Sequence, residues 1–245
     1  MKYNISIIAL LLGTGALLTA ESSYAADKGF YIGASAGYSS INTPGGSVYD
    51  AGTSTTETLI TQTSSDSTAG GFGGSLFAGY NINQTFAVEL GYTSYADSNY
   101  SSGQSQYTNI GEDNWAYNSS SSSSLNYKTH SIDLFLKGTV PVVAQVSAFA
   151  KLGASYVSQS VDYVNSTGTP TINIDNSTLA TPDVGNNTYT AFRPAGAIGL
   201  SYKVTENLST SIFAQGFLGK GDIQTENDAI ATAYLVGASV TYDFL

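Results

Sequence analysis

His130 and Ser131 are the imidazole and hydroxyl that could act together as base and nucleophile, and the chain has no other histidine. Neighbouring residues on a strand point to opposite faces, so on a strand this pair cannot form the hydrogen bond that such chemistry needs. The absence of cysteine excludes a thiol nucleophile, a zinc ribbon and a disulfide framework. We therefore expect no catalytic residues, no metal site and no cofactor.

Five charged residues could act instead through electrostatics. Glu89, Asp133, Lys137, Lys151 and Arg193 occupy the polar positions of segments in which polar and apolar residues alternate. If those segments cross a membrane, a charge facing lipid would cost about 2 to 4 kcal/mol, so the charges must face inward. Opposite signs can pair there, which predicts an ionic network that fills the interior. A charged constriction that selects solutes is the alternative.

The composition of the chain is unlike that of a soluble enzyme. Its 245 residues are 42% hydrophobic and 11% charged, and they include 26 Gly and 18 Tyr. A soluble domain carries about 25% charged residues. The formal net charge of −10, with only eight Lys and Arg, argues against a nucleic-acid partner.

Residues 1–25 have the three parts of a secretory signal peptide. Lys2 precedes an apolar run over residues 5–18, and Ser23, Tyr24 and Ala25 form a small-x-small cleavage site. The run has about 14 residues, whereas a membrane-spanning helix needs roughly 20. We expect cleavage after Ala25 and a single exported domain over residues 26–245.

Eight segments of the exported chain alternate with a period of two residues, which predicts strands. Apolar side chains lie on one face and small or polar side chains on the other, as in an eight-stranded barrel whose interior is just wide enough to be filled by side chains. Six tyrosines stand on the apolar face near the strand ends, where a membrane barrel carries its aromatic girdles. The segments are 30–38, 71–80, 86–93, 131–137, 146–156, 192–202, 208–217 and 233–244, and the tyrosines are Tyr38, Tyr80, Tyr92, Tyr156, Tyr202 and Tyr242.

The connections between these segments alternate strictly in length. Short ones cover residues 81–85, 139–145 around Pro141, and 203–207, whereas long ones cover 41–69, 97–126, 158–189 and 218–229. A soluble sandwich would have evenly short connections. The pattern predicts an all-β fold, an eight-stranded antiparallel up-and-down transmembrane barrel with short periplasmic turns and long extracellular loops. The long segments are acidic and rich in Ser, Thr, Asn and Tyr, so we expect polar loops that are mobile at their tips.

Four motifs carry a family resemblance. GFYIGASAGY at 29–38, GYNINQTFAVELGY at 79–92, AKLGASY at 150–156 and VGASVTYDF at 236–244 resemble the small outer-membrane β-barrels related to the opacity proteins and to the membrane domain of outer-membrane protein A. The resemblance implies the outer membrane of a Gram-negative bacterium and insertion by the barrel-assembly machinery. Its implied assembly signal is Val240, Tyr242 and Phe244, although Leu245 follows the aromatic residue with which such chains usually end.

Three functions remain open at this point. The first is a monomeric structural or surface-interaction protein, by resemblance an adhesin or antigen, embedded in lipid and lipopolysaccharide and binding an extracellular or host ligand. Trp115, with Tyr107 and Tyr117 nearby, is a candidate loop contact for that ligand. The second is a small solute channel. The third is a lipid-modifying enzyme, but lipid A deacylase barrels place His and Ser on one strand face, which His130 and Ser131 do not match.

Overall fold

This computed structural model describes residues 28–42, 58–111, 114–168, 183–219 and 230–244. The predicted signal peptide lies outside these ranges. Within the described residues the regular structure is entirely β, and no helix is long and apolar enough to cross a membrane. The strands are β1 (Gly29–Asn42), β2 (Thr58–Ala69), β3 (Gly71–Asn81), β4 (Phe86–Ser94), β5 (Ser98–Gly111), β6 (Asn114–Val143), β7 (Val146–Gly168), β8 (Asp183–Lys203), β9 (Leu208–Phe217) and β10 (Thr232–Asp243).

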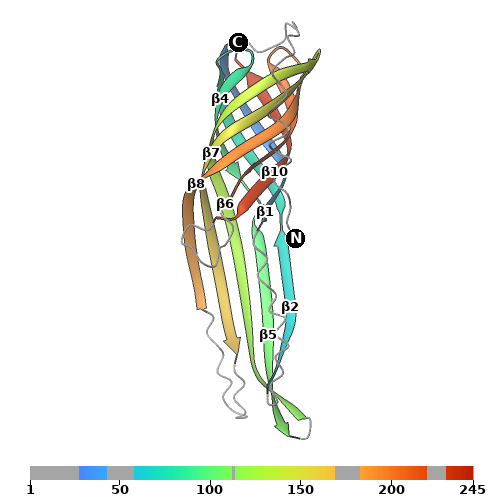
Figure 1. Cartoon of the computed structure of the whole chain (residues 1–245), viewed down its shortest axis with the longest axis vertical. Helices are drawn as coiled ribbons and strands as arrows, with labels where there is room; N and C mark the ends of the chain where they lie inside the picture. The colour runs from blue at the N-terminus through green and yellow to red at the C-terminus, as the bar shows by residue number, and fades with distance from the viewer. Residues whose placement is uncertain (1–27, 43–57, 112–113, 169–182, 220–229, 245) are drawn as a thin grey trace.

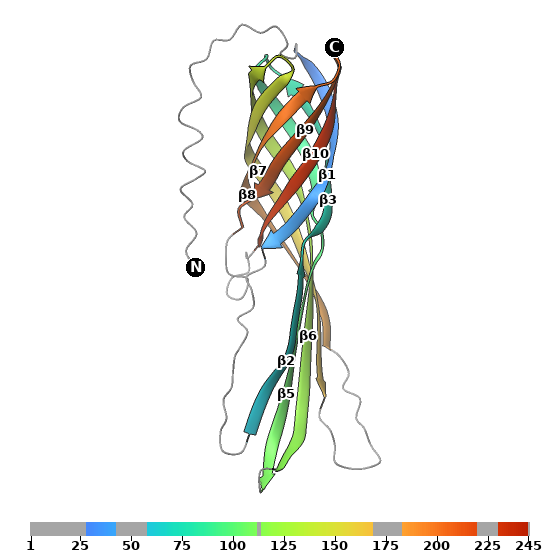
Figure 2. The same cartoon turned by 90° about the vertical axis from the view of Figure 1, so that its right-hand side faces the viewer.

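Eight of these strands form a closed antiparallel barrel. The order around the ring is β1, β3, β4, β6, β7, β8, β9 and β10, and β10 pairs again with β1. Each barrel strand therefore pairs with its predecessor among these eight, and the first strand pairs with the last. The prediction of an eight-stranded up-and-down barrel is confirmed, and Figures 1 and 2 show its strongly tilted strands at one end of the molecule.

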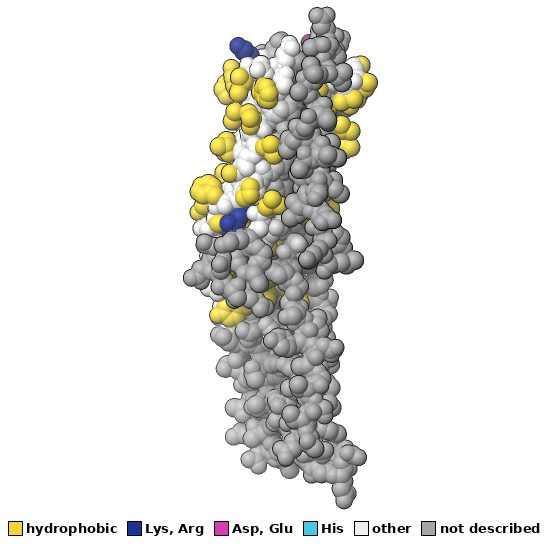
Figure 3. Space-filling view, in the orientation of Figure 1, with side chains coloured by type: hydrophobic (Ala, Val, Ile, Leu, Met, Phe, Trp, Pro, Cys, Tyr) yellow, Lys and Arg dark blue, Asp and Glu magenta, His cyan; other side chains and the backbone are white. Residues whose placement is uncertain are grey.

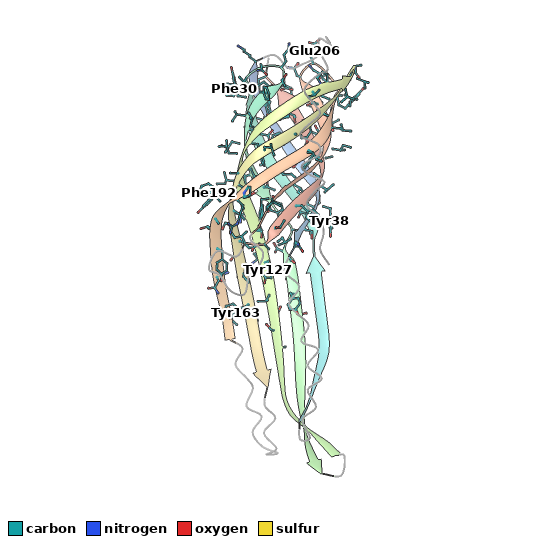
Figure 4. All side chains as sticks on the ribbon, viewed as in Figure 1. Phe30, Tyr38, Tyr127, Tyr163, Phe192 and Glu206 are labelled. Atoms are coloured by element: carbon teal, nitrogen blue, oxygen red, sulfur yellow. The ribbon has the colours of Figure 1, made fainter. Side chains whose placement is uncertain are left out.

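Alternation sorts the side chains into an apolar outer surface and a filled interior. On β4, Leu90 is 57% exposed, whereas the neighbouring Glu89 is 2% exposed. Figure 3 shows hydrophobic side chains spread over the described part of the barrel surface. In Figure 4, Phe30 marks the end of the barrel that carries the short turns, and Tyr38 and Phe192 mark the opposite end. Exposed apolar residues between these levels form the lipid-facing band.

Aromatic side chains gather at both borders of this band. Phe30 and Tyr80 pack with ring centroids 4.9 Å apart at the turn end, and Tyr156 and Phe192 pack at 5.1 Å at the other end. All six tyrosines that alternation placed on the apolar face are exposed: Tyr38, Tyr80, Tyr92, Tyr156, Tyr202 and Tyr242.

The short turns are closed by local hydrogen bonds. The Asn83 side-chain oxygen accepts hydrogen bonds from the Thr85 and Phe86 amides, at 2.8 and 2.7 Å. The predicted 139–145 turn is tighter than expected, because β6 runs on to Val143 and only two residues form the turn. Pro141 therefore lies in the strand beside a register shift, where its missing N–H is tolerated.

Long connections were expected as irregular loops, and this expectation is wrong for much of three of them. β2, β5 and the distal parts of β6, β7 and β8 pair in the order β2-β5-β6-β7-β8 and continue the barrel wall as a sheet. We call this sheet the extension; it is the elongated part of the molecule in Figures 1 and 2. Polar residues form strands here because the backbone ladder supplies the hydrogen bonds, although neither face is covered by lipid.

Gly70 joins the extension to the barrel between β2 and β3. Its φ is +119°, a backbone conformation that side-chain-bearing residues avoid. An ideal Cβ at this position would come 2.2 Å from the Tyr38 hydroxyl oxygen. Glycine therefore fits the single residue between β2 of the extension and β3 of the barrel.

Candidate functional site

Glu89 and Lys151 form a buried ion pair in the barrel lumen. The Lys151 ammonium donates a hydrogen bond to Glu89 Oε1, and the two side chains are 8% and 3% exposed. Tyr31 Oη donates to the other carboxylate oxygen, Oε2, at 3.0 Å. Both oxygens of Glu89 are therefore occupied by residues from two other strands, which ties β1, β4 and β7 together across the interior.

Aromatic rings surround this pair on the same level. Lys151 Nζ lies 4.8, 5.9 and 5.7 Å from the ring centroids of Phe77, Phe135 and Phe149. Rings at these distances attract the ammonium through their negative faces. The buried ion pair and these rings fill this level of the lumen with side chains.

Small residues opposite the rings make this packing possible. Tyr31 pairs with Gly79 across β1 and β3, and an ideal Cβ on Gly79 would come 2.2 Å from Tyr31 Cζ. Alternation predicted small inward residues, but only the register shows which glycine lies under which ring.

Asp133 forms a separate polar layer, nearer the extension. Its carboxylate accepts hydrogen bonds from Thr93 Oγ1 at 2.6 Å, from Ser131 Oγ at 2.8 Å, and from Ser155 Oγ. Gln215 Nε2 completes the layer at 3.3 Å. These donors are neutral, so Asp133 is held by hydroxyl and amide groups and forms no ion pair within the described residues.

The mouth beside the extension is closed by a third layer. Gln159 accepts a hydrogen bond from the Ala231 amide at 3.1 Å and donates one to Thr129 at 2.8 Å. Around this polar link lies an apolar cluster, in which the Tyr95 and Phe217 rings are 5.5 Å apart. The fully buried Ile230, next to Ala231, belongs to the same cluster. The residues just before β10 thus cover the lumen.

Among the five predicted charged residues, the described part of the chain shows one ion pair, and a single network of all five stays a prediction. Glu89 and Lys151 pair, whereas Asp133 lies in the next layer. Lys137 contacts the Tyr31 and Phe149 rings, with its ammonium 5.2 Å from each centroid. Arg193 is half-buried on the inward register of β8, opposite Ser155.

Sequence reasoning did not single out several residues that complete these layers. Alternation marked four of them as inward-facing, whereas Gln159 fell in the predicted long connection 158–189, and it assigned none of them a role because neutral hydroxyl and amide groups carry no distinctive signal. These residues are Tyr31, Thr93, Ser155, Gln159 and Gln215.

Of the remaining candidates, Ser131 faces the lumen and the others lie outside it. His130 is exposed and Ser131 is fully buried on β6, so the two point to opposite faces as expected. Trp115 lies in β6, paired with Asn109 of β5. The terminal residues Val240, Tyr242 and Phe244 are 52%, 45% and 48% exposed on the lipid-facing side.

Within the described residues, no group of three His, Asp or Glu side chains is placed to hold a metal ion. Glu112 and Asp113, an acidic pair of the second long connection, lie outside them.

The fold and its apolar band define the class: this is an integral β-barrel of the Gram-negative outer membrane. The chain belongs to the family of the OmpA-like transmembrane domain, whose model matches residues 25–245. An uncharacterized protein of Coxiella burnetii (strain RSA 493 / Nine Mile phase I) is 28% identical over 244 residues, which are 95% of this chain and 94% of that protein.

Similar solved structures include two outer-membrane proteins. Neisserial surface protein A is 15% identical with a TM-score of 0.44, over 88% of this chain and 97% of that chain. The outer membrane protein OprG from Pseudomonas aeruginosa is 10% identical with a TM-score of 0.42, over 90% and 99%.

Proposed function

We propose that this protein is a surface-interaction barrel, which anchors and displays an extracellular sheet that binds a host or environmental ligand. The observation that carries the proposal is the extension, in which strands of the barrel wall continue beyond the lipid-facing band. A barrel whose only role was to occupy the membrane would need no ordered strands beyond the lipid-facing band.

The outward face of the extension is a polar ladder. Lys128 donates to Asp162 Oδ2 at 2.9 Å, and Asn186 donates to the other oxygen of the same carboxylate. Asn186 also donates to Ser160 at 2.9 Å. These contacts link β6, β7 and β8 side by side, so the face is suited to recognising a ligand through preorganised polar groups.

The inward face of the extension is aromatic near the barrel. Tyr127 is buried, and the partly buried Leu125 and Tyr189 pack against the cluster that closes the lumen. Tyr163 lies against Gly185, because a Cβ at Gly185 would come 2.1 Å from Tyr163 Cζ. Figure 4 places Tyr127 and Tyr163 just beyond the Tyr38 and Phe192 border. The extension is therefore supported from inside by packed rings.

The proposal includes the surroundings of the barrel. We infer a monomer inserted by the barrel-assembly machinery, with Val240, Tyr242 and Phe244 as the terminal signal and with lipopolysaccharide around its outer half. No enzymatic step is part of the proposal.

Removal of the β5–β6 hairpin tests this function. Ser98 and Tyr127 are paired, so residues 99–126 can be replaced by an Asn-Gly turn that joins them. A non-adherent Gram-negative strain that displays the intact protein is expected to adhere to cultured epithelial cells, and the truncated variant should lose this adherence.

A matched control replaces residues 99–126 by a Gly/Ser linker of equal length, which keeps the length but not the strand pairing. Folding of each variant is checked by heat-modifiable gel mobility. Equal adherence of the intact, truncated and linker variants, all folded, would reject the proposal.

A further inference from the structure

The end of the barrel opposite the extension contains a cavity that the display function does not use. Its volume is about 110 Å³, enough for several water molecules. The walls include residues of the 81–85, 144–145 and 203–207 turns, so the cavity opens toward the periplasm. Its chemistry is set by Tyr31, Lys137, Phe149, Lys203 and Asp243, with Asn81 at the wall.

Lys137 is the distinctive group of this cavity. Both oxygens of Glu89, the nearby lumen carboxylate, already accept hydrogen bonds from Lys151 and Tyr31. Within the described residues, Lys137 forms no ion pair, and its ammonium has the Tyr31 and Phe149 rings at 5.2 Å as neighbours. An ammonium in this setting retains hydrogen-bonding capacity that a negatively charged oxygen would use.

The charges around the cavity favour an anion. Lys137 and Lys203 are opposed by one carboxylate, that of Asp243, which accepts a hydrogen bond from Asn81 Nδ2 at 3.3 Å. The cavity thus carries one net positive charge in a chain whose formal net charge is −10. Amide and hydroxyl groups of Asn81, Gln145 and Ser147 add neutral donors to the walls.

We propose that this cavity is a periplasm-facing binding site for a small oxyanion, either a carboxylate or a phosphate. Lys137 is its anchor, because its ammonium lies among aromatic rings that exclude water from one side. Lys203, the last residue of β8 at the turn end of the barrel, contributes the second positive charge.

The test uses full-length protein purified from outer membranes into detergent micelles, with the lysine side chains labelled with ¹⁵N. Sodium phosphate and sodium acetate are titrated separately against sodium chloride at constant ionic strength. We expect a saturable shift of the Lys137 ammonium resonance, while that of Lys128 at the extracellular end does not move. A response to phosphate alone or to acetate alone shows which of the two oxyanions the cavity binds. A response to both supports a general oxyanion site.

Two variants strengthen the test. Lys137→Gln should weaken binding at least tenfold, and Lys203→Gln, near the entrance, should weaken it severalfold without affecting the lumen packing. If Lys137→Gln does not fold, the resonance of the intact protein and the Lys203→Gln variant still decide the question. Absence of any saturable Lys137 shift, or an equal shift of Lys128, would overturn the proposal.

Discussion

At the residue scale, Glu89 and Lys151 depend on each other because each is a buried charge with the other as its ionic partner. We predict that Glu89→Ala lowers the free energy of unfolding by about 3 to 5 kcal/mol, since Lys151 is left buried without a counter-charge. The measurement is the urea midpoint of the barrel in lipid vesicles. The double variant Glu89→Leu with Lys151→Met should recover most of the loss, and an unchanged midpoint for Glu89→Ala would contradict the buried pair.

Gly79 supports the same layer through its lack of a side chain. A Cβ there would press on the Tyr31 ring, so Gly79→Ala should displace the tyrosine hydroxyl from Glu89. We predict a loss of about 1 to 3 kcal/mol, the usual cost of overpacking. Gly138→Ala is the matched control, because the nearest atom to its Cβ, Phe86 Cε1, is 3.8 Å away. The urea midpoints of the two variants would coincide if the Gly79 contact were unimportant.

At the scale of the strands, the extension and the short turns lie on opposite sides of the membrane. The chain has no cysteine, so single cysteines report their side without background. A membrane-impermeant maleimide added to intact cells is expected to label Ser124→Cys in β6, which is exposed, but not Gln145→Cys in the β6–β7 turn. Permeabilised cells should show both labels. Labelling of Gln145→Cys in intact cells would show that the short turns face the outside of the cell.

The polar ladder on the extension has its own pH dependence. The hydrogen bond from Lys128, and then that from Asn186, hold the pKa of Asp162 below its ordinary value of 3.8. Because its pKa is lower in the folded protein than in the unfolded chain, the ionised Asp162 carboxylate stabilises the fold at pH values above its unfolded-state pKa. This contribution is lost as the pH falls through the folded-state pKa. Carbon NMR of the Asp162 carboxyl should show a midpoint below 3.8 that rises in Lys128→Gln. An identical midpoint in both proteins would contradict the hydrogen bond between Lys128 and Asp162.

At the scale of the whole molecule, three stacked layers close the barrel: the Glu89 level, the Asp133 level and the apolar mouth. Eight strands leave little room beyond their own side chains. We predict that the purified protein shows no steady conductance in a planar bilayer, where a wide porin added afterwards confirms the sensitivity of the recording. Stable single-channel steps that change on neutralising Lys151 would favour the solute channel instead.

The sequence by itself determined which residues face lipid and which face the lumen. Successive side chains on a strand point to opposite faces, and lipid penalises a polar residue whatever its partner is. The order of residues along the chain was therefore enough to assign each face. The strands of the barrel, its short turns and its lipid-facing tyrosines followed from this rule.

Tertiary structure decided how the inward residues pair and how far the strands extend. Lys151 pairs with Glu89 rather than with Asp133 because strand register and barrel closure set which levels coincide, and residues 62 positions apart carry no local sign of that contact. The serine run 119–124 belongs to β6 although it does not alternate, because pairing with the neighbouring strands specifies it. A continuous apolar outer face is needed only where the strands meet lipid, so that pattern ends at the membrane border while the sheet continues.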